Sequence, residues 1–110
     1  MEERKILYFK DYFMNFYNGL EAKAQEKIDY ALMLLKSQNR LSERFTKHID
    51  EGIYELRARY KRNNYRLFYC FDEGNIVLLM NGFLKKTRKT PQNEIEKAKT
   101  IKKEYYENKE

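Results

Sequence analysis

Three short segments within residues 53–85 are rich in β-branched and aromatic residues, and they restrict the fold of this chain more than any other feature. The segments are IYELRARY (53–60), YRLFYCFD (65–72) and IVLLMNGFLK (76–85). KRNN joins the first to the second and DEGN joins the second to the third, and both connections contain residues typical of hairpin turns. The sequence therefore predicts three strands in an antiparallel meander.

The segments before the meander predict one more strand and two helices. KILYFK (5–10) predicts a short strand, and DYFMNFYNG (11–19) a short aromatic helix or turn. Residues 20–38 carry apolar side chains at helical spacing, which predicts a helix that faces the core. Residues 39–52 are polar and poorly periodic, and they predict a connecting loop with one helical turn at most.

A last helix is expected after the meander. Thr90 is the expected N-cap and Pro91 the expected first helical residue, followed by an apolar stripe that includes Ile95 and Ile101. The element order is then β-α-α-β-β-β-α, which makes the fold class α+β.

The composition is that of one folded domain over residues 1–110. Hydrophobic residues make up 42% of the chain and charged residues 36%, so the chain can bury a core. The single cysteine, Cys70, has no partner for an internal disulfide, and neither a leader nor a long apolar run is evident. These features predict a cytoplasmic protein that does not enter a membrane.

The positive charge of the chain is concentrated in the meander. The formal net charge is +6, and residues 1–52 and 90–110 each contain equal numbers of acidic and basic residues. Residues 53–89 contain nine Lys or Arg and only three Asp or Glu, so this segment carries the whole excess. Such a distribution favours a polyanionic partner.

The expected strand register gathers these cations on one face of the sheet. Alternation places Glu55, Arg57 and Arg59 together, opposite the apolar side of their strand. A two-residue turn at Asn63-Asn64 would set Arg57 opposite Cys70 and Arg59 opposite Phe68, with Arg66 on the same face.

The lysine that completes this basic face depends on the second hairpin. A two-residue turn at Glu73-Gly74 would set Arg66 opposite Asn81 and bring Lys85 to the same face, whereas a bulge at Gly74 would bring Lys86 instead. Guanidinium groups held on paired strands suit bidentate contact with phosphate.

These residues resemble the RelE/ParE superfamily of bacterial toxins, in particular its HigB-like branch related to phage Gp49 proteins. Three stretches carry the resemblance: GIYELR (52–57), YRLFY (65–69) and GFLKKTRKTP (82–91) followed by EIEKA (94–98). The resemblance implies a twisted, mainly antiparallel sheet with a helical hairpin on one face and a C-terminal helix. It also implies the toxin of a type II toxin-antitoxin system that cleaves mRNA on the ribosome without a metal or other cofactor.

Site residues follow from matching this sequence to the family pattern. The catalytic candidates are Arg57, Arg59, Arg66, Lys85 and Lys86. Further RNA-binding candidates are Lys61, Arg62, Phe83, Arg88 and Lys89. The expected chemistry is attack of a ribose 2′-OH on the adjacent phosphate, which gives a cyclic phosphate and a free 5′-OH.

The general base of such a reaction is not evident. Glu55 shares the Arg57 face and is either a base or a salt-bridge partner, and His48, the only histidine, falls in the expected loop and is interpreted as a bystander. The expected partners are mRNA, the ribosome and a HigA-like helix-turn-helix antitoxin, with operator DNA bound only through the antitoxin complex. Two alternatives stay open: a ParE-type inhibitor of DNA gyrase, and a non-catalytic nucleic-acid-binding module.

Overall fold

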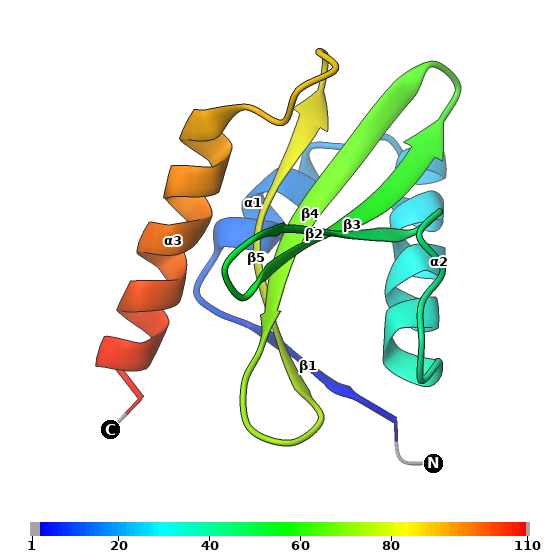
Figure 1. Ribbon diagram of the computed structural model, residues 1–110. Coiled ribbons are helices and arrows are strands. Elements are labelled where there is room, and N and C mark those ends of the chain that lie inside the picture. The colour runs from blue at the N-terminus through cyan, green and yellow to red at the C-terminus, as the bar shows by residue number, and fades with distance from the viewer. Residues whose placement is uncertain (1–2, 110) are drawn as a thin grey trace.

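The protein folds as a five-stranded sheet with helices on both faces (Figure 1), as seen in a computed structural model that describes residues 3–109. The α+β class expected from the sequence is confirmed. The elements within the described range, in chain order, are β1 (Lys5–Tyr8), α1 (Tyr12–Asn18), α2 (Ala22–Ser37), β2 (Thr46–Asp50), β3 (Ile53–Tyr60), β4 (Asn63–Phe71), β5 (Ile76–Lys85) and α3 (Gln92–Glu107).

The strands lie in the order β1-β5-β4-β3-β2. β1 is parallel to β5, and every other neighbouring pair is antiparallel, so β3, β4 and β5 form the expected meander at the centre of the sheet. β1 and β2 are the two edge strands of the sheet within residues 3–109.

The two faces of the sheet have separate apolar cores. On one face α1 and α2 pack against β3, β4 and β5, with Ile28, Leu35 and Leu67 among the buried residues. On the other face α3 packs through Ile95, Ala98 and Ile101. Figure 1 shows α2 and α3 on opposite sides of the sheet. Adjacent residues along a strand therefore face different helices, which is the structural basis of the period-2 pattern in the sequence.

The loop expected over residues 39–52 was a wrong prediction, because Thr46–Asp50 forms β2 and pairs with β3. This edge strand has polar or charged residues on both faces, so it lacks the apolar alternation that reveals a strand. One sequence signal for it exists. Asp50-Glu51-Gly52 repeats the tripeptide Asp72-Glu73-Gly74 of the β4–β5 turn, and both glycines adopt positive φ, 67° and 61°.

The predicted register of the first hairpin was also wrong. The two-residue turn is Lys61-Arg62 and not Asn63-Asn64, and Lys61 adopts the left-handed φ of 57°. Arg57 therefore lies opposite Arg66, and Arg59 lies opposite Asn64. The shift is an even number of residues, so every side chain keeps its predicted face.

Two alternatives were open for the second hairpin, and its register differs at two points from the one with a two-residue turn at Glu73-Gly74. Near the turn, Phe71 pairs with Val77, an offset of one residue from the predicted register. Between Leu67 and Tyr69 the register shifts again, and one residue of β4 faces two residues of β5. The two shifts together set Arg66 opposite Phe83 instead of Asn81 and return Lys85 to the Arg66 face.

The last helix begins one residue later than predicted. Pro91 is the N-cap of α3 and the first helical residue is Gln92, so Thr90 lies outside the helix. The buried Asn81 of β5 binds this end of the helix, because its side-chain amide donates to the Glu94 carbonyl oxygen at 3.2 Å and to the Glu94 carboxylate at 3.0 Å. The start of α3 is thereby fixed to the sheet.

Candidate nucleic-acid interface

A basic region occupies the part of the α3-side sheet face near the β3–β4 hairpin. α3 packs on the end of this face that contains Ile53, Phe68 and Cys70. Arg57, Arg66 and Lys85 lie further along β3, β4 and β5, on the same face. Arg57 and Arg66 are therefore held on strands with a hydrogen-bonded neighbour on each side, whereas Lys85 lies beyond the part of β5 that pairs with β1 and is held by β4.

A buried carboxylate lies beneath two of these arginines. Glu55 is 0% exposed, and Arg57 Nε donates to its Oε2 at 3.1 Å. Arg66 Nε lies 3.4 Å from Oε1 of the same carboxylate, an ion-pair distance too long for a good hydrogen bond. Both guanidinium groups are thus directed by one acid, which fits the salt-bridge alternative considered for Glu55.

Burial and like charge change the acidity of the basic residues. Burial lowers the pKa of Arg66; the Glu55 carboxylate opposes this shift and the Arg57 cation adds to it. Burial also lowers the pKa of Lys85, with the Arg66, Arg57 and Lys47 cations acting in the same direction and Glu55 against it. A lysine with a lowered pKa gives up its proton more readily than a solvated one.

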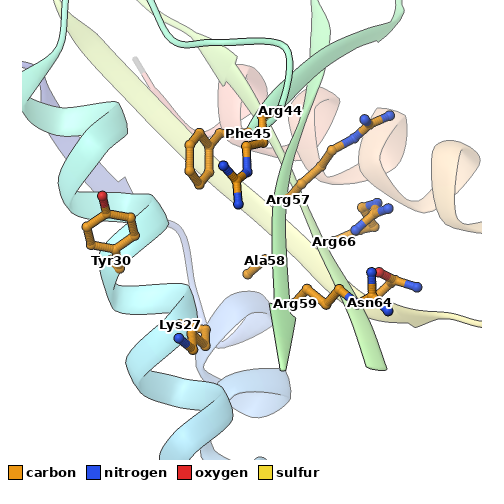
Figure 2. A pocket seen from close by; sticks show the side chains of 9 residues that line it. All are labelled: Lys27, Tyr30, Arg44, Phe45, Arg57, Ala58, Arg59, Asn64 and Arg66. Carbon is orange, nitrogen blue, oxygen red and sulfur yellow. The ribbon is translucent and has the colours of Figure 1, made fainter. Parts of the chain in front are cut away.

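Two hollows flank Arg66 and share Arg66 and Asn64. The first has a volume of about 420 Å³ and opens beside β3 where that strand extends past β2 (Figure 2). The second has a volume of about 560 Å³ and lies between the β3–β4 turn and the segment after β5. Among residues 3–109, the cations that line one or both hollows are Lys27, Arg44, Arg57, Arg59, Arg62, Arg66, Lys85, Lys86 and Arg88, and no carboxylate lines either.

Most of the catalytic and RNA-binding candidates named from the sequence meet at these two hollows, but three do not. Lys61 lies with Nζ 5.3 Å from the centroid of the Tyr60 ring, and neither Lys61 nor Lys89 lines a hollow. Phe83 is only 7% exposed and packs against Phe68 with ring centroids 5.2 Å apart. The ring of Phe83 belongs to the core in this structure, and it is not available to stack on a base.

The bulge decides which of the two lysines at the end of β5 lies on the face of the arginines. Lys85 lies opposite Asn64 on the Arg66 face and is partly buried, whereas Lys86 follows the strand and is exposed. Both line the second hollow. Lys85 is therefore the lysine held next to the arginines.

Five residues that line the first hollow were not named as site candidates from the sequence. They are Lys27 and Tyr30 from α2, Arg44 and Phe45 from the segment before β2, and Asn64 from β4. The positions of Arg44 and Phe45 depend on the pairing of β2 with β3, which the polar sequence of β2 concealed. The presence of Arg44-Phe45 directly before a strand is the only signal of this group in the sequence.

His48 lies away from the basic face. It pairs with Tyr54 across β2 and β3, and the two rings meet edge to face with centroids 5.2 Å apart. The neighbouring Lys47 pairs with Glu55, so alternation directs His48 to the opposite side of the sheet. This position agrees with the interpretation of His48 as a bystander.

Two kinds of feature are absent from residues 3–109. No group of three or more His, Cys, Asp or Glu side chains is arranged to hold a metal ion. None of the helices in this range is long and apolar enough to cross a membrane.

A five-stranded mixed sheet with a helix pair on one face and a C-terminal helix on the other is consistent with the RelE-like class of fold. A family model described as "Phage derived protein Gp49-like (DUF891)" matches residues 15–103, and the chain belongs to this family, which is RelE/ParE-like. A comparison with curated proteins gave no match. Membership indicates the toxin module of a toxin-antitoxin system, with an antitoxin as partner.

Proposed function

We propose that the protein is a HigB-like mRNA interferase, which cleaves mRNA on the ribosome and arrests translation in the cytoplasm. One observation carries the proposal: Arg57, Arg66 and Lys85 are brought together from three adjacent strands, with hollows on both sides that no carboxylate of residues 3–109 lines. Its regulator would be a HigA-like helix-turn-helix antitoxin, which would bring the toxin to operator DNA.

The arrangement suits charge stabilisation at phosphorus. When the ribose 2′-OH attacks, negative charge develops on the non-bridging oxygens of a phosphorane, and a fixed cation lowers the energy of that state. Arg66 takes this role because it is the more buried of the two arginines beside Glu55, with 12% of its side chain exposed against 29% for Arg57. Arg57 and Arg59 bind the phosphate before attack.

The leaving oxygen needs a proton as the P–O5′ bond breaks. Lys85 is the proposed donor, because its lowered pKa makes transfer of a proton to the 5′ oxygen easier. The products are a 2′,3′-cyclic phosphate and a free 5′-OH. The proton of the 2′-OH passes to solvent or to a ribosomal group, since Glu55 is ion-paired with two arginines.

The test is cleavage of a defined mRNA in a purified translation system, mapped by primer extension. Wild-type protein should cut the mRNA only when ribosomes are present. Arg66→Ala keeps the Arg57–Glu55 ion pair and should remain folded, which thermal unfolding checks. It should cleave at least a hundredfold more slowly, the loss expected for a single group that stabilises charge in the transition state. Lys103→Ala, which changes an exposed lysine of α3 outside both hollows, is the matched control.

The same purified proteins distinguish the proposed function from its two alternatives, a gyrase inhibitor and a non-catalytic nucleic-acid-binding module. A gyrase inhibitor would block DNA supercoiling and leave mRNA intact. A non-catalytic binding module would bind RNA in a salt-dependent manner and cleave none. Full cleavage by Arg66→Ala would show that the assignment of roles is wrong.

A further inference from the structure

Two aromatic side chains lie together at the rim of the first hollow. Tyr30 projects from α2 and is 52% exposed, and Phe45 directly precedes β2. Their ring centroids are 6.2 Å apart and the rings meet edge to face at 66°. Figure 2 shows both rings on the α2 side of β3, across the strand from the side chains of Arg57 and Arg66.

The backbone of Phe45 is held firmly next to the basic face. Its N–H donates to the carbonyl oxygen of Ser42 at 2.8 Å, and its own carbonyl oxygen accepts from the N–H of Arg57 at 2.8 Å. The Arg44 guanidinium lies 5.8 Å from the centroid of the Phe45 ring. The backbones of Phe45 and Arg57 are therefore joined by a hydrogen bond, and a ligand bound at one residue is within reach of the other.

The hollow combines the two kinds of group that single-stranded RNA requires. Aromatic faces stack on bases of any sequence, and guanidinium groups both bind phosphate and stack on base planes. Asn64, at the far side of the same hollow, supplies an amide with donors and an acceptor for a base edge. The volume of about 420 Å³ lies in the range of small-ligand pockets, about 300–1,000 Å³.

We propose that Tyr30 and Phe45 form a nucleobase-stacking subsite for the single-stranded RNA whose phosphate binds at Arg57 and Arg66, an inference that rests on the proposed function for the identity of the ligand. The strand follows the open edge of β3, with its phosphates on the guanidinium side and one base turned toward α2. A half-exposed tyrosine and a partly exposed phenylalanine beside a cluster of cations suit this use.

The test compares base-bearing and abasic RNA of the same charge. A short fluorescent 2′-O-methyl oligoribonucleotide, which cannot be cleaved, is titrated with protein alongside an abasic ribose-phosphate oligomer of equal length. The double variant Tyr30→Leu/Phe45→Leu should lose about tenfold in affinity for the base-bearing strand and keep its affinity for the abasic one. Tyr30→Phe should bind like wild type, because it keeps the ring.

Tyr8→Leu is the matched control. Tyr8 is 49% exposed, contacts Phe13 and lies on β1, at the sheet edge opposite β2. Its loss should leave both affinities unchanged. Thermal unfolding of each variant identifies any that fails to fold. If the double variant fails to fold, the single variant Tyr30→Leu, at a half-exposed site, replaces it.

The outcomes separate this inference from the proposed function. Equal losses on both oligomers, or no loss on either, would overturn the stacking subsite even if wild-type protein cleaves mRNA. Loss of antitoxin binding with unchanged RNA affinity would also overturn it. A selective loss on base-bearing RNA would support the subsite even if wild-type protein cuts no mRNA on ribosomes, in which case only the proposed cleavage fails.

Discussion

Glu55 is the residue on which the geometry of the basic face depends. Its buried carboxylate directs the guanidinium groups of Arg57 and Arg66, which would otherwise repel each other from directly opposed positions on β3 and β4. Alternation places Glu55 on the Arg57 face from the sequence alone. Its ion pair with Arg66 depends on the distance between two strands, and no local sequence pattern contains that distance.

We expect Glu55→Ala to destabilise the fold by about 3 kcal/mol, since removal of one member of a buried ion pair leaves the other charges uncompensated. The lower end of the usual range applies because 29% of the Arg57 side chain remains in contact with solvent. Urea unfolding followed by circular dichroism measures the change in free energy.

Glu96→Ala is the control for this prediction. Glu96 pairs with Lys99 on the exposed side of α3, with 58% of its side chain accessible, so its loss should cost well under 1 kcal/mol. If both variants lost the same small amount of stability, Glu55 would have no special part in the site.

At the scale of elements, α3 is attached to the sheet at both ends. Asn81 binds its first turn through Glu94. At the other end the hydroxyl of Tyr105 donates to Asp72 Oδ2 at 2.5 Å, and Lys109 forms an ion pair with the same carboxylate at 2.9 Å. Asp72 directly follows β4, so it ties the end of the helix to the turn of the second hairpin.

This attachment predicts a pH dependence of stability. The hydrogen bond from Tyr105, and then that from Lys109, lowers the pKa of Asp72 below its ordinary value of 3.8. The folded state therefore prefers the charged carboxylate, and its contribution to stability is complete above pH 3.8 and is lost as the pH falls through the folded pKa. We expect Asp72→Asn to lower the unfolding temperature at pH 7 and to reduce the further loss between pH 4 and pH 2.5, measured by calorimetry.

Glu107→Gln serves as the comparison for Asp72, because it removes an exposed carboxylate from the same end of α3. Its pH profile should follow that of wild type. An Asp72→Asn protein with an unchanged profile would mean that the carboxylate contributes nothing to the attachment of the helix.

The elements differ in how well their sequences predict them. The meander strands and α2 repeat apolar residues with a clear period, so their existence and faces are predictable. β2 is an edge strand whose TKHID sequence has no such period, and its pairing with β3 is decided by the Glu51-Gly52 turn and by contacts such as the Thr46–Tyr69 side-chain hydrogen bond of 2.7 Å. Missing β2 also concealed the positions of Arg44 and Phe45.

On the scale of the whole molecule, the excess positive charge found in residues 53–89 becomes one surface. α2 adds Lys27 to it and the segment before β2 adds Arg44, although both come from a part of the chain that is neutral overall. The result is a pair of adjoining cationic hollows. Such an elongated basic surface suits an extended polyanionic strand better than it suits a single anion.

The charge predicts a steep dependence of RNA binding on salt. If a single strand occupies both hollows and neutralises about five phosphates, log K should fall with log salt concentration with a slope of about −3.5. Arg88→Ala, at the end of the second hollow, should reduce the size of the slope by about 0.7. Fluorescence titrations of single-stranded RNA over a range of salt concentrations measure it.

Lys103→Ala removes the same charge from a position outside both hollows and should leave the slope unchanged. A slope near zero for wild-type protein, or equal reductions in the two variants, would contradict the assignment of the RNA to this surface. The net charge would then affect RNA binding only through the overall electrostatic field of the molecule.

The sequence by itself determined which side chains share a face. Arg57, Arg59 and Arg66 stay on one side of the sheet although the predicted register of the first hairpin was wrong, because the register differs from the prediction by an even number of residues. The side of the sheet to which a side chain points is a local property of the strand backbone, so alternation alone predicts it.

Only the tertiary structure decided which residues meet. The offset of β3 against β4 set Arg57 opposite Arg66 over Glu55, and the bulge in β5 turned Lys85 toward the site instead of Lys86. The pairing of β2 brought Phe45 beside Arg57 and opposite Tyr30. Offsets, bulges and edge pairings depend on turns and on packing between distant segments, so no single stretch of the sequence contains them.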